Sequence, residues 1–443
     1  METFVITGGK SLTGEIHVGG AKNVALKILI ASLLTDDEMI IHNVPRLRDV
    51  FSLIDVLTSL GVHVDFRNHD LRIKNGSVAN RPNVPLDLGA KLRTSSMVLG
   101  PLLARYGKAL VPNPGGCRLG ARPIDRHIEG LRLMGATITY DSEDGYFHAE
   151  AAKLHGATIR FEKNTHTGTE TILLAAVLAE GTTVIENAAA EVEVDDLIAC
   201  LNQMGAEIQR KDARTIVING VEKLHGVEYT IMPDRNEEVT FAIASAMCGG
   251  SVVVRQSQRQ NLGVFLEAFT KAGGAFEALD ETSTKYFRGP TLLATDIVTM
   301  PYPGFMTDWQ APWAVFMTQA DGVSSIHETV FESRFSYVSE LAKMGATIQF
   351  FDPKVEKPES FYNFNWEDRR EGYHQGIRIK GPVKLHNAVL SADDIRAGAS
   401  LVLAALVAEG ESYLSNAERI DRGYEDLEGR LRMLGASIIR KSE

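Results

Sequence analysis

Cationic side chains recur where the sequence predicts that helices begin. Lys22, Arg93 and Arg396 each stand just before a strongly apolar helical stretch. The first turn of a helix presents free N–H groups and the positive end of the helix dipole, so it favours an anion and opposes a cation. A helix cap alone would explain a residue such as Asp308, but it does not explain a cation. Three cations in equivalent positions therefore predict a bound anion.

A second set of cations lies near the start of the more amphipathic helical stretches. Its members are Arg46, Arg48, Arg122, Arg334, Arg419 and Arg422. Each one alone is explained as a solvated surface arginine. Together they predict a cleft between two domains with positively charged walls, which would suit a substrate carrying several negative charges.

The loop from 112 to 123 is rich in glycine and proline, and it carries Cys117 next to Arg118. Neighbouring cations lower the pKa of a thiol and raise its reactivity, so Cys117 is a candidate functional thiol as well as an incidental loop cysteine. Cys200 and Cys248 lie in apolar helical contexts and are expected in the core. His127 follows the loop at helical spacing and is expected to brace that helix.

The elements that position these residues form a repeat. A helix, a glycine and then a strand recur at intervals of 68–90 residues. The glycine is typical of a helix end that turns through positive φ. The six glycines are Gly61, Gly135, Gly205, Gly273, Gly345 and Gly435. Upstream of each lies a helix that is apolar on nearly every face, and hence predicted to be buried. These helices are expected at Val24–Leu34, Ser96–Ala104, Ile172–Ala179, Thr240–Met247, Ala311–Ala320 and Ala399–Ala408.

Six α/β units in 443 residues predict two domains of three units each. The first domain is expected to span 22–230, and the second to combine 1–21 with 231–443. The early strand Phe4–Ile6 is predicted to complete the last unit. The polar and aromatic segment at about 351–376 interrupts the regular spacing of the repeats and is interpreted as a surface excursion.

Composition excludes several classes of protein. A net charge of −11 argues against nucleic acid or an anionic membrane as a partner. The longest apolar runs are too short to span a bilayer, and the N-terminal residues do not resemble a signal peptide, so a cytoplasmic protein is expected. Three widely spaced cysteines match no zinc pattern.

Several motifs together resemble the enolpyruvyl transferases, and most specifically the members of that family that act on UDP-N-acetylglucosamine. The resemblance runs from about Phe4 to Ile439, apart from the segment around 351–376. The motifs that carry it are Gly20-Ala21-Lys22-Asn23, Pro114-Gly115-Gly116-Cys117, Gly120-Ala121-Arg122-Pro123-Ile124-Asp125, Thr307-Asp308-Trp309-Gln310, Glu332-Ser333-Arg334-Phe335, Asp394-Ile395-Arg396-Ala397 and Ile420-Asp421-Arg422-Gly423-Tyr424. The resemblance implies two inside-out α/β barrel domains, built from six βαβαββ-type units with pseudo-three-fold symmetry in each domain.

The resemblance also implies a reaction, in which the enolpyruvyl group of phosphoenolpyruvate moves to the 3-hydroxyl of UDP-N-acetylglucosamine at the first committed step of peptidoglycan synthesis. It implies no metal, no organic cofactor, a monomer, and sensitivity to fosfomycin through Cys117. The residues it assigns to catalysis are Cys117, Asp308 (the general base), Lys22 and Arg396. The residues it assigns to substrate binding are Asn23, Arg93, Arg122, Pro123, Asp125, Lys163, Thr165, His166, Thr167, Gly168, Val330, Arg334 and Arg422.

Two stretches depart from the family pattern. The family usually reads Ser-Val-Gly-Ala-Thr where this chain has residues 165–169, and it commonly has Ile and Gly where this chain has Asn236 and Val239. The 165–169 loop contacts the nucleotide in the family, so another nucleotide acceptor such as uridine monophosphate stays open. A catalytically silent paralogue and an RNA-end-processing enzyme of similar repeat architecture stay open as well.

Overall fold

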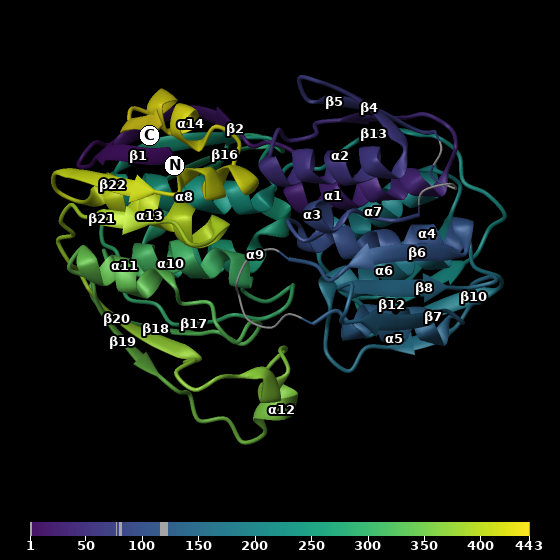
Figure 1. Ribbon diagram of the computed structural model, residues 1–443. Coiled ribbons are helices and arrows are strands. Elements are labelled where there is room, and N and C mark those ends of the chain that lie inside the picture. The colour runs from purple at the N-terminus through teal and green to yellow at the C-terminus, as the bar shows by residue number, and fades with distance from the viewer. Residues whose placement is uncertain (1, 77, 79–81, 116–122, 443) are drawn as a thin grey trace. The chain divides into compact units, whose positions relative to one another are not determined.

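A computed structural model describes residues 2–76, 78, 82–115 and 123–442 (Figure 1). These residues fold into two compact units. The first unit holds residues up to Gly19 together with Pro233 onward, and the second holds the residues between Gly20 and Met232. Within the described residues, the chain therefore passes from one unit to the other after Gly19 and again after Met232. The domain boundaries expected from the repeat stay a prediction.

The predicted repeat is present in the fold. In the typical unit a strand precedes the buried helix, and a second strand follows that helix and pairs in parallel with the first. After a second helix, an antiparallel pair of strands completes the sheet. The third repeat shows the pattern, because β10 (Thr182–Glu186) pairs in parallel with β9 (Thr158–Arg160) and antiparallel with β12 (Thr215–Asn219), which pairs with β11 (Glu207–Asp212).

In the second unit the other two sheets pair in the same way, except that the parallel strand of the first repeat comes from the end of the unit and not from before the buried helix. The sheet of the first repeat has the order β13-β3-β5-β4, and its strands are β13 (Glu228–Thr230), β3 (Met39–His42), β5 (Asp70–Asn75) and β4 (Val62–Arg67). The sheet of the second repeat has the order β6-β8-β7, with strands β6 (Lys108–Pro112), β8 (Tyr146–Glu150) and β7 (Thr137–Asp141). In this sheet an isolated parallel bridge from Asn83 to Leu110 stands where the other repeats have a strand.

The first unit has three four-stranded sheets among its described residues. One sheet has the strand order β15 (Gly274–Ala278), β16 (Ser283–Arg288), β14 (Gly250–Arg255) and β2 (Leu12–His17). Another has the order β17 (Ile297–Val298), β18 (Gly322–His327), β20 (Gly376–Gly381) and β19 (Thr347–Phe351). The third has the order β21 (Val389–Ser391), β22 (Glu411–Ser415), β1 (Glu2–Thr7) and β23 (Ser437–Ser442). Strand β1 pairs with both β22 and β23, so the start of the chain completes the last repeat, as predicted.

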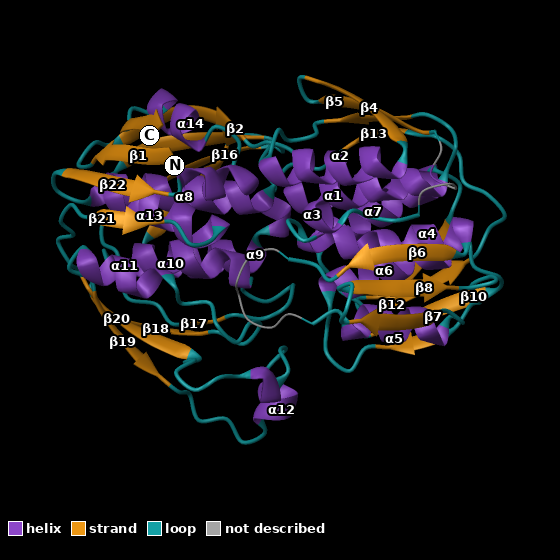
Figure 2. Cartoon of the chain, viewed as in Figure 1, coloured by secondary structure: helices purple, strands orange, loops and turns teal. Residues whose placement is uncertain are grey.

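The all-round apolar helices form the interior of each unit, with the sheets outside them (Figure 2). In the first unit α8, α10 and α13 pack on one another, and in the second unit α4 packs on α6. The helices are α1 (Lys22–Ala31), α4 (Leu99–Tyr106), α6 (His166–Ala176), α8 (Arg235–Cys248), α10 (Gln310–Met317) and α13 (Ile395–Val407). Their burial confirms the predicted α/β repeat and its inside-out packing.

The second helix of each repeat ends at the predicted glycines, all of which have φ between +86° and +102°. A residue with a Cβ is strained in that region, so the turn from helix to strand depends on glycine. These helices are α2 (Arg48–Leu60), α5 (Asp125–Leu133), α7 (Val192–Gln203), α9 (Gly263–Lys271), α11 (Tyr337–Lys343) and α14 (Leu427–Met433). The short helix α3 (Leu86–Gly89) precedes α4.

The segment between β19 and β20 has an internal aromatic cluster. It contains α12 (Pro358–Phe361) and the 3-10 helix η6 (Trp366–Asp368). The ring of Tyr362 stacks on Trp366 with centroids 4.8 Å apart, and its hydroxyl lies 3.0 Å from His327 Nε2 on β18. The predicted surface excursion is therefore anchored to its sheet by a buried tyrosine.

Candidate active site

Within the first unit, Asp308 lies between two buried arginines. It belongs to the 3-10 turn η5 (Thr307–Trp309), which leads into the apolar helix α10. Arg334 Nη2 donates to Asp308 Oδ1 at 2.6 Å, and Arg396 Nη2 lies 3.7 Å from Asp308 Oδ2. The carboxylate is about one-fifth exposed, whereas both guanidinium groups are nearly buried. The three residues, which were predicted as candidates in two neighbouring repeats, thus meet at one place.

Local structure explains how Arg396 reaches this position. The carboxylate of Asp394 caps α13 by accepting from the backbone N–H groups of Arg396 and Ala397. The guanidinium of Arg396 then lies over the Tyr424 ring, 5.1 Å from its centroid. Its Nη1 is buried and has no hydrogen-bond partner among the described residues. A buried N–H group of this kind is a suitable donor to an anionic ligand.

Both arginines stay charged in this environment. Burial by itself would lower the pKa of Arg334, but Asp308 and Asp394 raise it above its ordinary value. Burial likewise opposes the charge of Arg396, while Tyr424 and Asp308 raise its pKa. The unit therefore holds two permanent cations on one carboxylate, an arrangement that can bind a phosphate or a carboxylate group.

Trp309, next to Asp308, is fixed by a residue that departs from the family pattern. Its indole Nε1 donates to Asn236 Oδ1 at 2.9 Å, and both side chains are buried. The guanidinium of Arg235 lies 5.8 Å from the Trp309 ring centroid. In the sequence Asn236 stands out only as a departure from the family pattern, and the contact gives it a role in holding the turn of Asp308.

In the second unit, Lys22 has an anionic partner of its own. It is the first residue of α1, and its Nζ lies 3.3 Å from Asp49 Oδ2 on α2. Both side chains are largely buried. Asp49 was absent from the sequence-based candidates, and it supplies a negative charge that offsets the cation at this helix start.

Arg93 also reaches a neighbouring segment. It begins the 3-10 helix η3 (Arg93–Val98), and its Nη2 donates to the carbonyl oxygen of Pro123 at 3.0 Å. Two predicted binding residues are thereby brought together. Arg93 joins the start of one helix to the residues just before α5.

The start of α6 gathers four of the predicted binding residues. Thr165 is the N-cap, and its Oγ1 accepts from Gly168 N at 3.2 Å. His166 Nε2 lies 3.2 Å from Glu170 Oε1, and the other oxygen of Glu170 lies 3.1 Å from Lys27 Nζ. Burial by itself would lower the pKa of His166, but Glu170 reverses the direction and raises it. Glu170 has a lowered pKa despite its burial, because His166 and Lys27 favour the charged carboxylate.

His127, which was predicted to brace its own helix α5, contacts this start of α6. Its Nε2 lies 2.9 Å from Thr167 Oγ1, so the ring joins α5 to α6. Burial, reinforced by Arg93, lowers the pKa of His127 to about 3. The ring is therefore neutral near neutral pH, which suits a structural contact and not a proton transfer.

The remaining predicted residues lie at the ends of elements. Asn23 is the second residue of α1, Asp125 begins α5, Arg422 ends the 3-10 helix η7 (Ala417–Arg422), Lys163 precedes α6, and Val330 follows β18. Cys117 and Arg122 lie outside the described residues. In the second cationic set, Arg46 and Arg419 donate to backbone carbonyl oxygens at the surface, which fits the interpretation as surface arginines.

The other two cysteines differ in burial. Cys200 is buried, as predicted, whereas Cys248 is only half-buried because it ends α8. Burial raises the pKa of the Cys248 thiol to about 12. Neither described cysteine has the reactive environment expected of Cys117.

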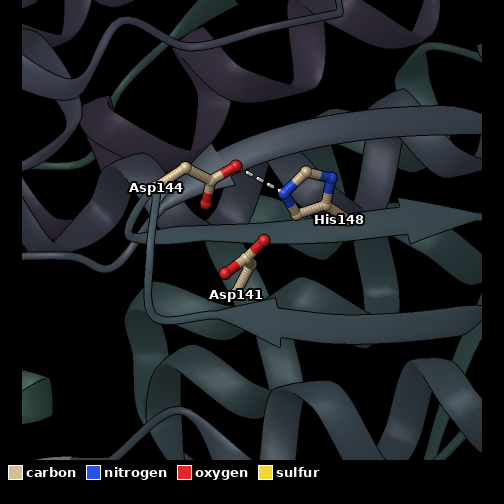
Figure 3. Close-up of side chains that lie close together, drawn as sticks. All are labelled: Asp141, Asp144 and His148. Carbon is tan, nitrogen blue, oxygen red and sulfur yellow. Dashed lines mark hydrogen bonds and ion pairs between the residues drawn. The ribbon is translucent and has the colours of Figure 1, made fainter.

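A surface cluster of Asp141, Asp144 and His148 lies at the turn between β7 and β8 (Figure 3). Asp144 Oδ2 lies 2.8 Å from His148 Nε2, and its other oxygen accepts from Tyr146 N. Asp141 accepts from Glu143 N. Since these contacts close the turn and all three side chains are exposed, the cluster is explained as a hairpin connection.

None of the helices in the described part of the chain combines the length and apolar character needed to cross a bilayer.

Solved structures share this architecture over the whole chain. The enolpyruvyl transferase NikO from Streptomyces tendae superposes with a TM-score of 0.85 at 24% identity, covering 100% of this chain and 99% of that one. EPSP synthase from Acinetobacter baumannii superposes with a TM-score of 0.75 at 18% identity over 100% of both chains. The fold is therefore that of the enolpyruvyl transferases.

The sequence comparisons give the family. The model of EPSP synthase (3-phosphoshikimate 1-carboxyvinyltransferase) matches residues 6–431. Proteins named UDP-N-acetylglucosamine 1-carboxyvinyltransferase are similar over their full length: 44% identity for that of Acidobacterium capsulatum (99% of this chain, 96% of the relative) and 43% for that of Dichelobacter nodosus (100% of both). The chain belongs to the EPSP synthase family.

Proposed function

We propose that this protein transfers the enolpyruvyl group of phosphoenolpyruvate to the 3-hydroxyl of UDP-N-acetylglucosamine with release of phosphate, the first committed step of peptidoglycan synthesis. The observation that carries the proposal is the 42–44% full-length identity to proteins named for this reaction. The placement of Asp308 between two buried arginines supports it independently.

Asp308 is assigned as the general base. It would take the proton of the acceptor hydroxyl while that oxygen bonds to C2 of phosphoenolpyruvate and C3 gains a proton. The resulting tetrahedral adduct carries both the sugar oxygen and the phosphate on C2. Loss of a proton from C3 and cleavage of the C2–O bond to phosphate then give the enolpyruvyl ether and inorganic phosphate. No cofactor takes part.

The cations are assigned to the two anionic groups of phosphoenolpyruvate. Lys22, Arg122 and Arg396 would hold that substrate, and Arg93, Arg334 and Arg422 would complete the positive surroundings. Buried, preorganised cations stabilise charge that develops in the transition state without the cost of reorienting solvent. The orphaned Nη1 of Arg396 supports this role, because a phosphate oxygen would satisfy it.

The acceptor is assigned to the start of α6 and to residues of several other elements. Asn23 would orient the sugar, and the binding set would further include Pro123, Asp125, Lys163, Thr165, His166, Thr167, Gly168 and Val330. Cys117 is assigned to the protonation of C3 and to product release, and its modification by fosfomycin is expected to inactivate the protein. We further propose that it works in the cytoplasm as a monomer.

A second candidate is transfer to another nucleotide, such as uridine monophosphate. The observation that favours it is the ion pair of His166 with buried Glu170 in the loop that departs from the family pattern. A change in charge at a nucleotide-contacting loop alters which acceptor is preferred. The full-length relatives favour UDP-N-acetylglucosamine.

Phosphate release separates these candidates. Inorganic phosphate is measured with phosphoenolpyruvate and UDP-N-acetylglucosamine, uridine monophosphate, or no acceptor. The proposal expects release that depends on UDP-N-acetylglucosamine. Release only with uridine monophosphate would support the second candidate, and the absence of release with either acceptor would indicate a silent paralogue.

A further inference from the structure

A single buried carboxylate connects the turn of Asp308 to another loop of the first unit. Glu328 follows β18, and its side chain is fully buried. Its Oε2 accepts from Thr307 Oγ1 at 2.8 Å and from Gln310 Nε2 at 3.2 Å. Its Oε1 accepts from the backbone N–H groups of Val330 at 2.8 Å and Phe331 at 3.0 Å. Four donors thus converge on the two oxygens of one side chain.

These donors lie on both sides of the proposed site residues. Thr307 directly precedes Asp308, and Gln310 follows it by two positions, so the two bonds to Oε2 span the base-bearing turn. Gln310 is fixed further, because its Oε1 accepts from the Tyr337 hydroxyl at 2.9 Å. The two bonds to Oε1 hold the loop that carries Val330, which is assigned to the acceptor.

The charge of Glu328 also bears on the neighbouring arginine. Burial raises the pKa of Glu328, while Arg334 and the donated hydrogen bonds oppose that rise. In return, the charge of Glu328 adds to those of Asp308 and Asp394 in raising the pKa of Arg334. Four donated hydrogen bonds favour the ionised form of a carboxylate. The negative charge of Glu328 then partly offsets the two positive charges of the arginines that contact Asp308.

We propose that Glu328 is a positioning residue that holds the Asp308 turn and the Val330 loop in register for the acceptor hydroxyl. The inference rests on the proposed function, since it supplies the geometry in which Asp308 meets its substrate. Glu328 itself need not touch either substrate. A base displaced by about 1 Å can cost roughly 100-fold in rate, so the fixing of this turn has a measurable consequence.

The test replaces Glu328 by glutamine and by aspartate. Glutamine keeps the shape but has one acceptor oxygen, and its amide N–H groups would face donors. Aspartate keeps the charge but is one methylene shorter, so it can serve only part of the donor set. We expect Glu328→Gln to lower kcat by about 10- to 100-fold and to raise the KM for UDP-N-acetylglucosamine more than that for phosphoenolpyruvate. Glu328→Asp should restore part of kcat.

A matched control is Glu238→Gln in the same unit. Glu238 on α8 is also fully buried and accepts from Ser257 Oγ, Gln258 N and Tyr286 Oη. Its replacement makes the same chemical change without touching the Asp308 turn. It should lower the melting temperature as Glu328→Gln does, with kcat and both KM values unchanged.

Hydrogen exchange gives a readout that does not depend on turnover. In Glu328→Gln the backbone amides of 307–310 and 328–331 should exchange faster, whereas Glu238→Gln should leave them as in the wild type. Wild-type exchange in Glu328→Gln would overturn the proposal, as would equal losses of kcat in the two glutamine variants. If the wild-type protein released no phosphate, the proposed function would be wrong, and the exchange comparison would still decide whether Glu328 holds the turn.

Discussion

Replacing His127 by glutamine should reduce the loss of stability of this protein in mild acid. The imidazole of His127 is 4% exposed and contacts Thr167 in the second unit. Burial lowers its pKa from an ordinary 6.5 to about 3. The ring is therefore neutral in the folded protein and takes up a proton only on unfolding. Its contribution to stability is present above about pH 6.5 and is lost as the pH falls toward 3.

The size of the effect follows from the shift. One pKa unit corresponds to about 1.4 kcal/mol. Because His127 stays neutral in the folded protein and becomes protonated in the unfolded chain, it lowers the free energy of unfolding by about 2 kcal/mol between about pH 7 and pH 5. Glutamine does not titrate and can still hydrogen-bond to Thr167. The free energy of unfolding of the variant should lack this pH-dependent contribution. All other titrating groups are the same in the two proteins, so their contributions cancel in the comparison.

The assay is urea unfolding at the two pH values, followed by circular dichroism. The wild-type free energy of unfolding should fall by about 2 kcal/mol more than that of His127→Gln. His155→Gln, at an exposed position, controls for the loss of an imidazole and should follow the wild type. Equal losses of the free energy of unfolding in wild type and His127→Gln between the two pH values would show that His127 is not a buried, neutral imidazole.

Glu170→Gln should leave Lys27, which is 3% exposed, without a full counter-charge and cost about 3–5 kcal/mol of stability; an unchanged urea midpoint would contradict this. Asn236→Ala should leave the Trp309 indole N–H unsatisfied, which costs about 1–3 kcal/mol. It should also lower kcat because Trp309 adjoins Asp308, and wild-type kcat would show that Trp309 does not fix the base. Fosfomycin should inactivate the wild type and spare Cys117→Ser; equal inactivation of both would place its target elsewhere.

The repeat could be predicted because its signals are local. A glycine at a helix end and an apolar stretch on all faces of a helix are both readable within about a dozen residues. Gly61 and Gly435 stand in the same backbone conformation, although the whole repeat array separates them. The placement of β1 in the last sheet was predicted because this strand precedes the first full repeat.

The partners of the site residues could not be predicted, because they come from distant parts of the chain. Asp49 lies one helix beyond Lys22, and Asn236 meets Trp309 across 73 residues. Nothing in the spacing of these residues encodes the contacts, which depend on how the helices pack. Glu328 carried only a weak signal, namely one carboxylate directly after a strand.

Asp308, Arg334 and Arg396 were all predicted from the sequence as site residues, and the structure places them together. Asp308 and Arg396 stand at equivalent helix starts of neighbouring repeats, which face the same end of a unit, whereas Arg334 belongs to the same repeat as Asp308. Cations at helix starts do not by themselves require a bound anion, because Asp49 and Asp308 already supply negative charge to Lys22 and Arg396.

The role of Asp308 as the base is tested most directly by following the product by mass spectrometry in wild type and Asp308→Asn. Both are incubated with phosphoenolpyruvate and UDP-N-acetylglucosamine, and the exposed residue Asp296, replaced by asparagine, serves as the control. We expect an enolpyruvyl ether of UDP-N-acetylglucosamine with the wild type and with Asp296→Asn, and its formation should be about 100- to 10,000-fold slower with Asp308→Asn. Wild-type rates with Asp308→Asn would contradict the assignment of the base, and the absence of this product with the wild type would contradict the proposed function.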